Sequence, residues 1–453
     1  MPPDGSTAIM GRSQTATEDS RTPYSHHDTM DSEPTIPTTP TSESDVEKDD
    51  ASPTQAPQLV DTSVENRRQS EEATKDSDLK SMTQRKVPTK DDTKKEGEVD
   101  VMDIPTKVDI VWRNVFLFVY LHVFSAYGVY LLLSGQVMWQ TFIWTALIHS
   151  CGALGITAGA HRFWAHKSYK AKLPLKLILV FMQTVSFQNS IHEWSRDHRV
   201  HHKYSETNAD PHNAKRGFFF AHMGWLLCRK HPAVKEKGKQ IDMSDLEADP
   251  LIMFQKKYYV PLVLWTSFFM PTLVAWYFWG ESFITAWCFA SQLRYCFNLH
   301  CTWLVNSAAH LWGDKPYDQT INPSENKGVS IFAFGEGWHN YHHVFPWDYK
   351  TAELGRYKYN FTAAFIDFFA WIGWAYDLKT VSDKMVRDRV RRTGDGSWRH
   401  EKEAASLTDM TDSLASSMGM GHGGPWGWGD KDIPMTDSQM TQTLYPLISL
   451  HED

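Results

Sequence analysis

Three groups of histidines stand out among the 21 in this 453-residue chain, because their spacing could bring several imidazoles to a metal ion. Two groups share the pattern HxxHH, and the third reads HxxxxH. On a helix, residues i, i+3 and i+4 lie on one face, so each HxxHH segment presents three imidazoles together. Residues i and i+5 diverge by about 140° on an α-helix, so the third group works only where a helix straddles the site or ends. The groups are His161 and His166; His198, His201 and His202; and His339, His342 and His343.

Eight imidazoles exceed what one ion accepts, so the count predicts two metal ions. Neutral imidazole suits zinc, copper, iron and nickel, and ligand type alone leaves the metal open. A structural zinc site is complete with four ligands and needs only one ion. Two ions held by nitrogen beside the membrane segments described below favour redox chemistry with dioxygen, for which iron is the main candidate. The Glu-x-x-His pattern of soluble di-iron proteins occurs only once, at Glu336–His339, and "HEWSRDH" is not the HExxH of zinc proteases.

The elements that must position these histidines include four apolar runs near the ~20 residues that a helix needs to cross a bilayer. The gaps "SGQ" and "GES" make each pair a tight helical hairpin, and Lys and Arg lie outside the hairpins. By the positive-inside rule, both termini and the basic segments are expected in the cytoplasm. The predicted spans are Val111–Leu133, Val137–Ala158, Tyr258–Trp279 and Phe283–Leu304.

A fifth apolar run, Pro174–Ser190, separates the first two histidine groups. If all groups share one compartment, this run cannot cross the membrane, and we expect it flat on the cytoplasmic interface or buried under the site. The two spans between the second and third groups then restore the same side. The sequence therefore predicts an all-α membrane protein, with four transmembrane helices in two hairpins and a cytoplasmic helical cap that holds a dimetal histidine site.

The two ends of the chain differ in composition from this folded part. Residues 1–100 are rich in Ser, Thr, Pro and charged side chains and poor in aromatic ones, which predicts a disordered arm with neither a secretory signal nor a transit peptide. Residues 101–397 form the predicted domain, and the Gly-rich residues 398–453 are expected to be a flexible tail. The net charge of −8 is spread over these ends, the five cysteines predict buried thiols facing a reducing cytosol, and we expect no nucleic-acid partner.

Several long segments resemble the membrane-bound acyl-CoA desaturases of the stearoyl-CoA type, particularly the insect branch. They are "GITAGAHRFWAHKSYKA", "FQNSIHEWSRDHRVHHKYSETNADPHNAKRGFFFAHMGWLL", "WLVNSAAHLWGDKPYD" and "GEGWHNYHHVFPWDYK", and the likeness spans roughly Ile110 to Gly394. The resemblance implies an endoplasmic reticulum membrane enzyme with two iron ions. It would use dioxygen to insert a cis double bond, most often delta-9, into saturated C16 and C18 fatty acyl-CoA during unsaturated fatty acid biosynthesis.

The resemblance also implies roles for individual residues. His310 matches a ninth histidine ligand, and Asn306 matches an asparagine that reaches one metal through water. No catalytic residue separate from the metal ligands is expected. The positions that match substrate contacts of the family are Asn114, Asn189, Arg196, Asp197, Arg229, Lys230 and Trp303. The cations among them suit CoA phosphates, although Arg229 and Lys230 also fit a positive-inside flank and Arg196 a surface pair with Asp197. The histidines left as structural are His122, His149, His192, His212, His222, His231 and His300.

Desaturation needs an electron donor, because dioxygen takes four electrons and the substrate supplies two. The HPGG haem motif is absent: "HPAV" breaks it and "HGGP" inverts it. A separate donor is therefore expected, in this family cytochrome b5 with its NADH-dependent reductase, beside membrane lipid. A hydroxylase with the same histidine spacing and a non-redox zinc receptor or metal carrier are the alternatives. Insect relatives also act at other positions, although "NPSE" at Asn322–Glu325 is more typical of the delta-9 type.

Overall fold

The computed structural model describes residues 108–353, 359–398 and 424–446. The predicted arm at residues 1–100 and part of the predicted tail lie outside these ranges. The described chain is mostly helical, which confirms the helical part of the predicted fold. Its strands form two short antiparallel pairs, β1 (Lys170–Ala171) with β2 (Ala375–Tyr376) and β3 (Leu378–Thr380) with β4 (Gln442–Leu444).

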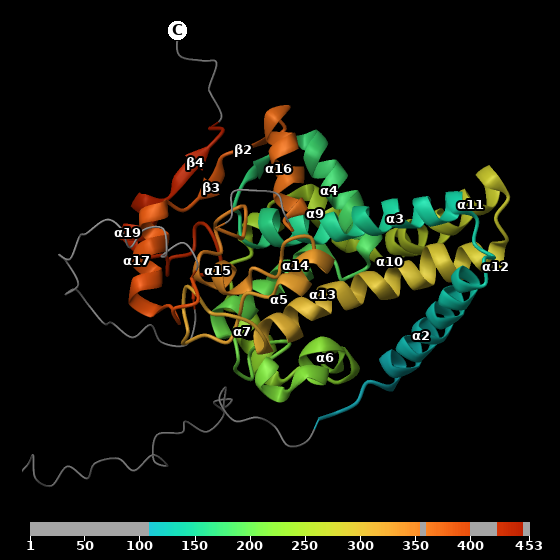
Figure 1. The fold of residues 1–453 in the computed structure, drawn as a ribbon, viewed down its shortest axis with the longest axis horizontal. Helices are drawn as coiled ribbons and strands as arrows, with labels where there is room; N and C mark the ends of the chain where they lie inside the picture. The colour runs from blue at the N-terminus through green and yellow to red at the C-terminus, as the bar shows by residue number, and fades with distance from the viewer. Residues whose placement is uncertain (1–107, 354–358, 399–423, 447–453) are drawn as a thin grey trace, which may run out of the picture. The chain divides into compact units, whose positions relative to one another are not determined.

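Three helices of the described chain are long and apolar enough to cross a membrane. The first is α2 (Trp112–Leu133). The second joins α3 (Trp139–Leu154) to the π-helical η1 (Gly155–Ala165), and the third joins α10 (Tyr259–Val263), η4 (Leu264–Phe269) and α11 (Met270–Trp279). Figure 1 shows these helices extending together away from the shorter helices and the strands. They match three of the four predicted spans, and many of their large apolar side chains are exposed.

The fourth predicted span falls in a continuous helix made of α12 (Phe283–Ala286), η5 (Trp287–Leu293) and α13 (Arg294–Leu311). This helix is not among the three spans, because polar side chains interrupt its apolar surface. Arg294 is buried, and its Nη2 donates to the carbonyl oxygen and the Oγ of Ser267 at 2.7 and 2.8 Å. A charged group inside the helix bundle is tolerated because its donors are satisfied by neighbouring oxygens.

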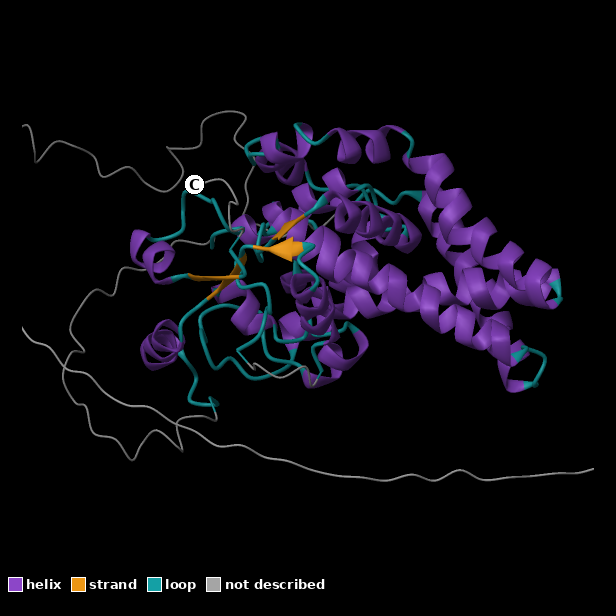
Figure 2. Ribbon diagram, turned by 90° about the horizontal axis from the view of Figure 1, so that it is seen from above, coloured by secondary structure: helices purple, strands orange, loops and turns teal. Residues whose placement is uncertain are grey.

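The remaining helices gather at the other end of the long helices, as Figure 2 shows. The first of them, α4 (Leu173–Ser186), covers most of the fifth apolar run and packs on α3 and η1. Gly155 permits this contact, since a Cβ there would lie 2.2 Å from the Met182 carbonyl carbon. The others are α5 (Ile191–Tyr204), η2 (Ala214–Arg216), η3 (Phe220–Gly224), α6 (Trp225–Leu227), α7 (Pro232–Gly238), α8 (Ser244–Glu247), α9 (Pro250–Lys257), α14 (Lys327–Phe332), α15 (His339–Val344), α16 (Phe361–Trp371), α17 (Asp383–Thr393) and α19 (Met435–Met440).

Residues 424–446, here called the C-terminal strap, fall in the segment that the sequence predicted to be a flexible tail. In the structure they instead pack on the rest of the fold, through α19 and the pairing of β4 with β3. Trp426 is buried, and the Arg199 guanidinium lies 4.1 Å from the centre of its indole ring. Tryptophan supplies a large apolar surface to a stretch whose glycines suggest only flexibility.

Candidate dimetal site

The nine predicted histidine ligands converge in two clusters in space, here called the first group and the second group. Each of them takes residues from more than one of the sequence motifs. In the first group, His161 Nε2 lies 3.0 Å from His342 Nε2, and His166 Nε2 lies 2.8 Å from His198 Nε2. His202 joins it, since its Nε2 lies 3.0 Å from that of His342. The first group is therefore His161, His166, His198, His202 and His342.

The second group contains four histidines, one of which is the predicted ninth ligand, His310. The Nε2 atoms of His339 and His310 lie 2.9 Å apart, and those of His343 and His339 lie 3.1 Å apart. His201 Nε2 completes the group at 3.3 Å from His343 Nε2. The sequence prediction that these nitrogens could gather around two ions agrees with this geometry.

Each HxxHH segment divides between the two groups. On α5, His198 and His202 enter the first group and His201 the second; on α15, His339 and His343 enter the second and His342 the first. Residues i and i+4 are about 40° apart on a helix, whereas i+3 lies about 60° to the other side of i. The three imidazoles on one helix face therefore do not stay together: the i, i+4 pair lies in one group and i+3 lies in the other.

The HxxxxH pair is brought together by a π-helical turn. The backbone N–H of His166 donates to the carbonyl oxygen of His161 at 3.0 Å, which is the i to i+5 hydrogen bond of a π-helix. This turn places the two residues one above the other, although on an α-helix they would diverge. The local change of helix type is therefore what allows both imidazoles to enter the first group.

Acceptors behind the histidines fix the orientation of several rings. His201 Nδ1 lies 2.9 Å from Asp210 Oδ1, His310 Nδ1 lies 2.9 Å from Glu206 Oε1, and His161 Nδ1 lies 2.9 Å from Glu336 Oε2. An acceptor at Nδ1 holds the proton there and leaves the Nε2 lone pair for a metal. Glu336, whose spacing from His339 matches the Glu-x-x-His pattern, instead contacts the Nδ1 of a candidate ligand, His161.

The fourth acceptor comes from the C-terminal strap. The Trp426 carbonyl oxygen accepts a hydrogen bond from His166 Nδ1, and Trp428 N donates to the His166 carbonyl oxygen at 2.8 Å. Gly427 has a φ of +154°, and a Cβ there would lie 2.4 Å from the same carbonyl oxygen. Sequence reasoning missed this segment, because a Gly-rich stretch gives no signal for a backbone acceptor.

The charges around the site suit neutral imidazoles. Glu336 is buried, which by itself would raise its pKa, but the Arg162 guanidinium and His161 lower the pKa below its usual value. Burial, reinforced by the neighbouring histidines, lowers the pKa well below its usual value for His166, His198, His201, His202, His339, His342 and His343. Neutral rings with converging lone pairs are the form that binds transition metals, so these residues fit two such ions.

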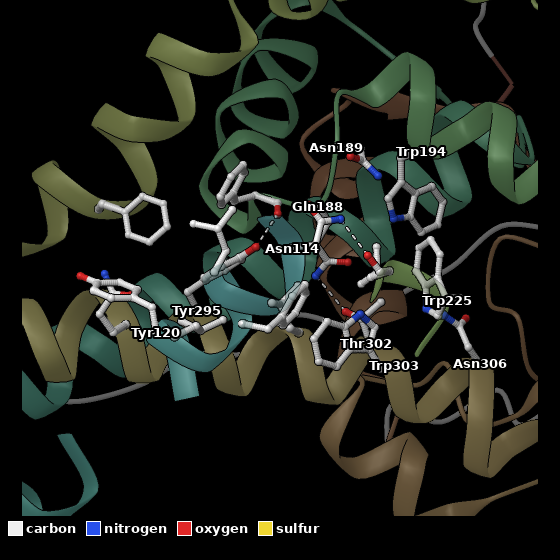
Figure 3. A pocket seen from close by; sticks show the side chains of 18 of the residues that line it. Asn114, Tyr120, Gln188, Asn189, Trp194, Trp225, Tyr295, Thr302, Trp303 and Asn306 are labelled. Carbon is white, nitrogen blue, oxygen red and sulfur yellow. Dashed lines mark hydrogen bonds between the residues drawn. The ribbon is translucent and has the colours of Figure 1, made fainter. Parts of the chain in front are cut away.

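A cavity of about 510 Å³ begins beside the first group. His198, Trp194 and Asn306 line one end, and Figure 3 shows Asn306 and Tyr120 on opposite sides of it. The walls between them are mainly aromatic and aliphatic. A long apolar cavity that ends at a candidate metal ligand suits an acyl chain.

Four of the predicted substrate residues line this cavity, and three do not. Asn114, Asn189, Asp197 and Trp303 belong to its wall. Asn114 Nδ2 donates to the Leu226 carbonyl oxygen at 2.8 Å, so the wall itself holds this amide (Figure 3). The cations Arg196, Arg229 and Lys230 lie outside the described lining.

Two of these cations meet the carboxylate of Asp197. Arg196 Nη2 lies 2.8 Å from Asp197 Oδ1, and Lys230 Nζ contacts Asp197 Oδ2. Burial alone would raise the pKa of Asp197, but Lys230 and Arg196 lower it below its usual value. The backbone N of Arg229 donates to the Asp109 carbonyl oxygen at 2.8 Å. His212, for which the sequence predicts only a structural role, also lines the cavity, and its ring centre lies 4.4 Å from that of His201.

Comparison with known proteins agrees with this geometry. Residues 137–376 match the family described as "Fatty acid desaturase". The chain is 58% identical to an acyl-CoA delta-9 desaturase of Acheta domesticus over 333 residues, which are 74% of this chain and 86% of that protein. It is 55% identical to an acyl-CoA delta(11) desaturase of Spodoptera littoralis over 64% of this chain and 85% of that protein. It is also 55% identical to stearoyl-CoA desaturase of Homo sapiens over 65% of this chain and 81% of that protein. A histidine-lined site at the end of an apolar cavity and relatives of this similarity lead to one conclusion: the chain belongs to the fatty acid desaturase family.

Proposed function

We propose that this protein is an acyl-CoA desaturase that introduces a cis double bond at the delta-9 position of saturated C16 and C18 fatty acyl-CoA. The observation that carries the proposal is the apolar cavity that ends at His198 and Asn306, beside the two histidine groups. A bound chain in this cavity would bring one pair of methylenes to the metal ligands. Relatives are named as delta-9, delta-11 and delta-12 desaturases. Membership of the family therefore does not fix the position of the double bond, and delta-9 is a separate proposal.

The proposed ligands are the nine histidines, with Asn306 acting through water, and the proposed metals are two iron ions. When bound, two irons supply the oxidising power that removes two hydrogens from adjacent methylenes while dioxygen becomes two waters. The balance requires two further electrons and two protons, for which we propose cytochrome b5 and its NADH-dependent reductase. The protein's own residues orient the imidazoles through their Nδ1 acceptors and hold the acyl chain in a dry cavity.

We further propose that the protein lies in the endoplasmic reticulum membrane, with both termini and the histidine groups in the cytoplasm. The helix Phe283–Leu311 would supply the fourth span through residues 283–304. Hydrogen-bonded burial of Arg294 supports this placement, because the charge faces the bundle and not lipid. The even number of spans between the second and third histidine motifs keeps both on one side.

Product analysis tests the proposed reaction. Expressed in a yeast strain that lacks its own desaturase, the full chain should restore growth without added unsaturated fatty acid. Gas chromatography with mass spectrometry should show C16 and C18 acids with a cis double bond at carbon 9. A hydroxy acid would instead identify a hydroxylase, and a bond at carbon 11 or 12 would contradict the delta-9 assignment while keeping the desaturase.

Neutralising Arg229 and Lys230 together should weaken substrate binding. Replacing both with Gln is expected to raise the KM for stearoyl-CoA roughly a hundredfold or more with little change in kcat, because charge-assisted hydrogen bonds to CoA phosphates contribute about 1.5–3 kcal/mol each. Steady-state assays on microsomes would measure both constants. Lys235→Gln, at an exposed position of α7, is the matched control. An unchanged KM would contradict the proposed CoA contact.

The end of the cavity away from the histidines should set the preferred chain length. There Trp287 Nε1 donates to Tyr120 Oη at 3.1 Å, and both residues line the cavity. Trp287→Ala is expected to raise the ratio of kcat/KM for C20 over C18 substrates about tenfold, because two more methylenes can be buried at about 0.8 kcal/mol each. Trp276→Ala, half exposed on α11 and outside the described lining, is the control. If Trp287→Ala kept the wild-type ratio of kcat/KM for C20 over C18 substrates, the methyl end of the acyl chain would have to lie elsewhere.

A further inference from the structure

A further set of metal-binding side chains lies between α2 and α13, apart from both histidine groups. His122 comes from α2, and Cys296 and His300 come from α13. Their ligand atoms all lie within 4.8 Å of one another. The sequence predicts only a structural role for both histidines and a buried thiol for the cysteine, and the proposed reaction uses none of them.

The hydrogen bonds on one side of this set determine where the protons of His300 lie. Ser307 Oγ donates to the Trp303 carbonyl oxygen at 2.8 Å, so it accepts from His222 Nδ1 at 3.0 Å. His222 Nε2 then carries a lone pair, which accepts from His300 Nδ1 at 2.9 Å. The proton of a neutral imidazole sits on one nitrogen only, so His300 Nε2 has none.

The proton of His122 also lies on Nδ1. Its Nδ1 lies 2.6 Å from the Phe118 carbonyl oxygen, which can only accept, so Nδ1 carries the proton. His122 Nε2 is therefore also a bare lone pair, and it lies 3.1 Å from His300 Nε2. Two lone pairs at this distance repel each other, and a cation between them would turn the repulsion into two bonds.

The distance suits a metal ion. Two imidazoles bound at 2.0–2.1 Å to one tetrahedral ion place their nitrogens about 3.3 Å apart. The Nε2 pairs inside the two histidine groups lie 2.8 to 3.3 Å apart, so the 3.1 Å pair has the same spacing. Cys296 adds a sulfur ligand, which the two groups lack, and its side chain is buried.

We propose that His122, Cys296 and His300 bind one additional metal ion, of the thiophilic kind represented by Zn²⁺ or Cu⁺. Two imidazoles with one thiolate are a ligand set for these ions, and the thiol loses its proton on binding. The ion would cross-link α2 to α13. Because Trp303 and Leu299 of α13 and Leu117 and Phe118 of α2 all line the acyl cavity, this cross-link would hold that part of the cavity wall in place.

Metal counting on the purified full chain in detergent tests the proposal. Elemental analysis after growth with iron and zinc should give three ions per wild-type chain and two for His300→Asn or Cys296→Ser. Asn can still donate toward His222, so that variant keeps the neighbouring hydrogen bond. The control is Cys301→Ser, because Cys301 is a buried thiol of the same helix that belongs to none of the candidate ligand groups among the described residues. This variant should keep three ions.

Cobalt gives a second measurement that does not depend on activity. Chain stripped by chelator and loaded with Co²⁺ should show a sulfur-to-cobalt charge-transfer band in the near ultraviolet. This band should persist in Cys301→Ser and disappear in Cys296→Ser, whereas the histidine groups contribute no sulfur. The same ion count in wild type and His300→Asn, or a cobalt spectrum without the sulfur band, would overturn the proposal and leave a shared proton between the two imidazoles.

Discussion

Replacing His342 with alanine is expected to abolish alkene formation and to release metal from the first group. His342 Nε2 lies 3.0 Å from the Nε2 atoms of both His161 and His202, so it joins the ring from η1 to the ring from α5. Outer-shell changes cost 10–100-fold in metal affinity, and loss of a ligand should cost more. We therefore expect activity to fall by more than about a hundredfold, measured as labelled oleate formed by microsomes, with a parallel fall in iron per chain.

A matched control for this variant is His231→Asn. His231 caps α7, where its side chain accepts from Ala233 N, and asparagine is a good N-cap residue. This variant should keep wild-type activity and iron content, which shows that removing a histidine elsewhere is tolerated. Alkene formation by His342→Ala within a fewfold of wild type would remove His342 from the ligand set.

The second large effect is expected from the C-terminal strap. Gly427→Val should displace the strap from His166, because a Cβ at residue 427 would lie 2.4 Å from the His166 carbonyl oxygen and because valine disfavours the φ of +154°. His166 Nδ1 would then lose its acceptor, the Trp426 carbonyl oxygen. We expect iron to be retained 10–100-fold less tightly, measured as the chelator concentration that removes half of the iron.

The control for this variant is Met435→Ala, in α19 of the same strap. Met435 is 76% exposed, so its removal should leave both iron retention and activity unchanged. Full iron retention in Gly427→Val would show that the strap covers the site without supporting His166. Loss of the whole fold would instead appear as aggregation in size-exclusion chromatography before any chelator is added.

Much of the histidine site could be predicted from the sequence, because helical spacing is a local property. The separations within "HRVHH" and "HNYHH" place imidazoles on one helix face wherever the helix sits. The division of each face between two groups could not be predicted in this way, since it depends on where α5 and α15 lie relative to η1 and α13. The inclusion of His166 depends on a π turn, for which the sequence carries no reliable signal.

The parts of the fold that the sequence did not reveal depend on distant contacts. Trp426 is buried, and Arg199, far away in the chain, presents its guanidinium to the indole ring. Arg294 lowers the mean hydropathy of the helix Phe283–Leu311, although Ser267 oxygens accept hydrogen bonds from its guanidinium inside the bundle. The average composition of a short stretch does not depend on a partner residue that lies elsewhere in the chain, so it cannot predict such a contact.

Because the strap is synthesised last, the two histidine groups are completed at different times during synthesis. The acceptors of His201 and His310 are Asp210 and Glu206, which are synthesised before the final histidine motif. His166 must wait for residue 426, far downstream, before its ring is held. Because chains fold progressively from the N-terminus as they emerge, the second group can mature while the first still lacks a support. A premature stop codon after the final histidine motif and before residue 424 should therefore leave the second group complete with its acceptors and the first group without the Trp426 acceptor.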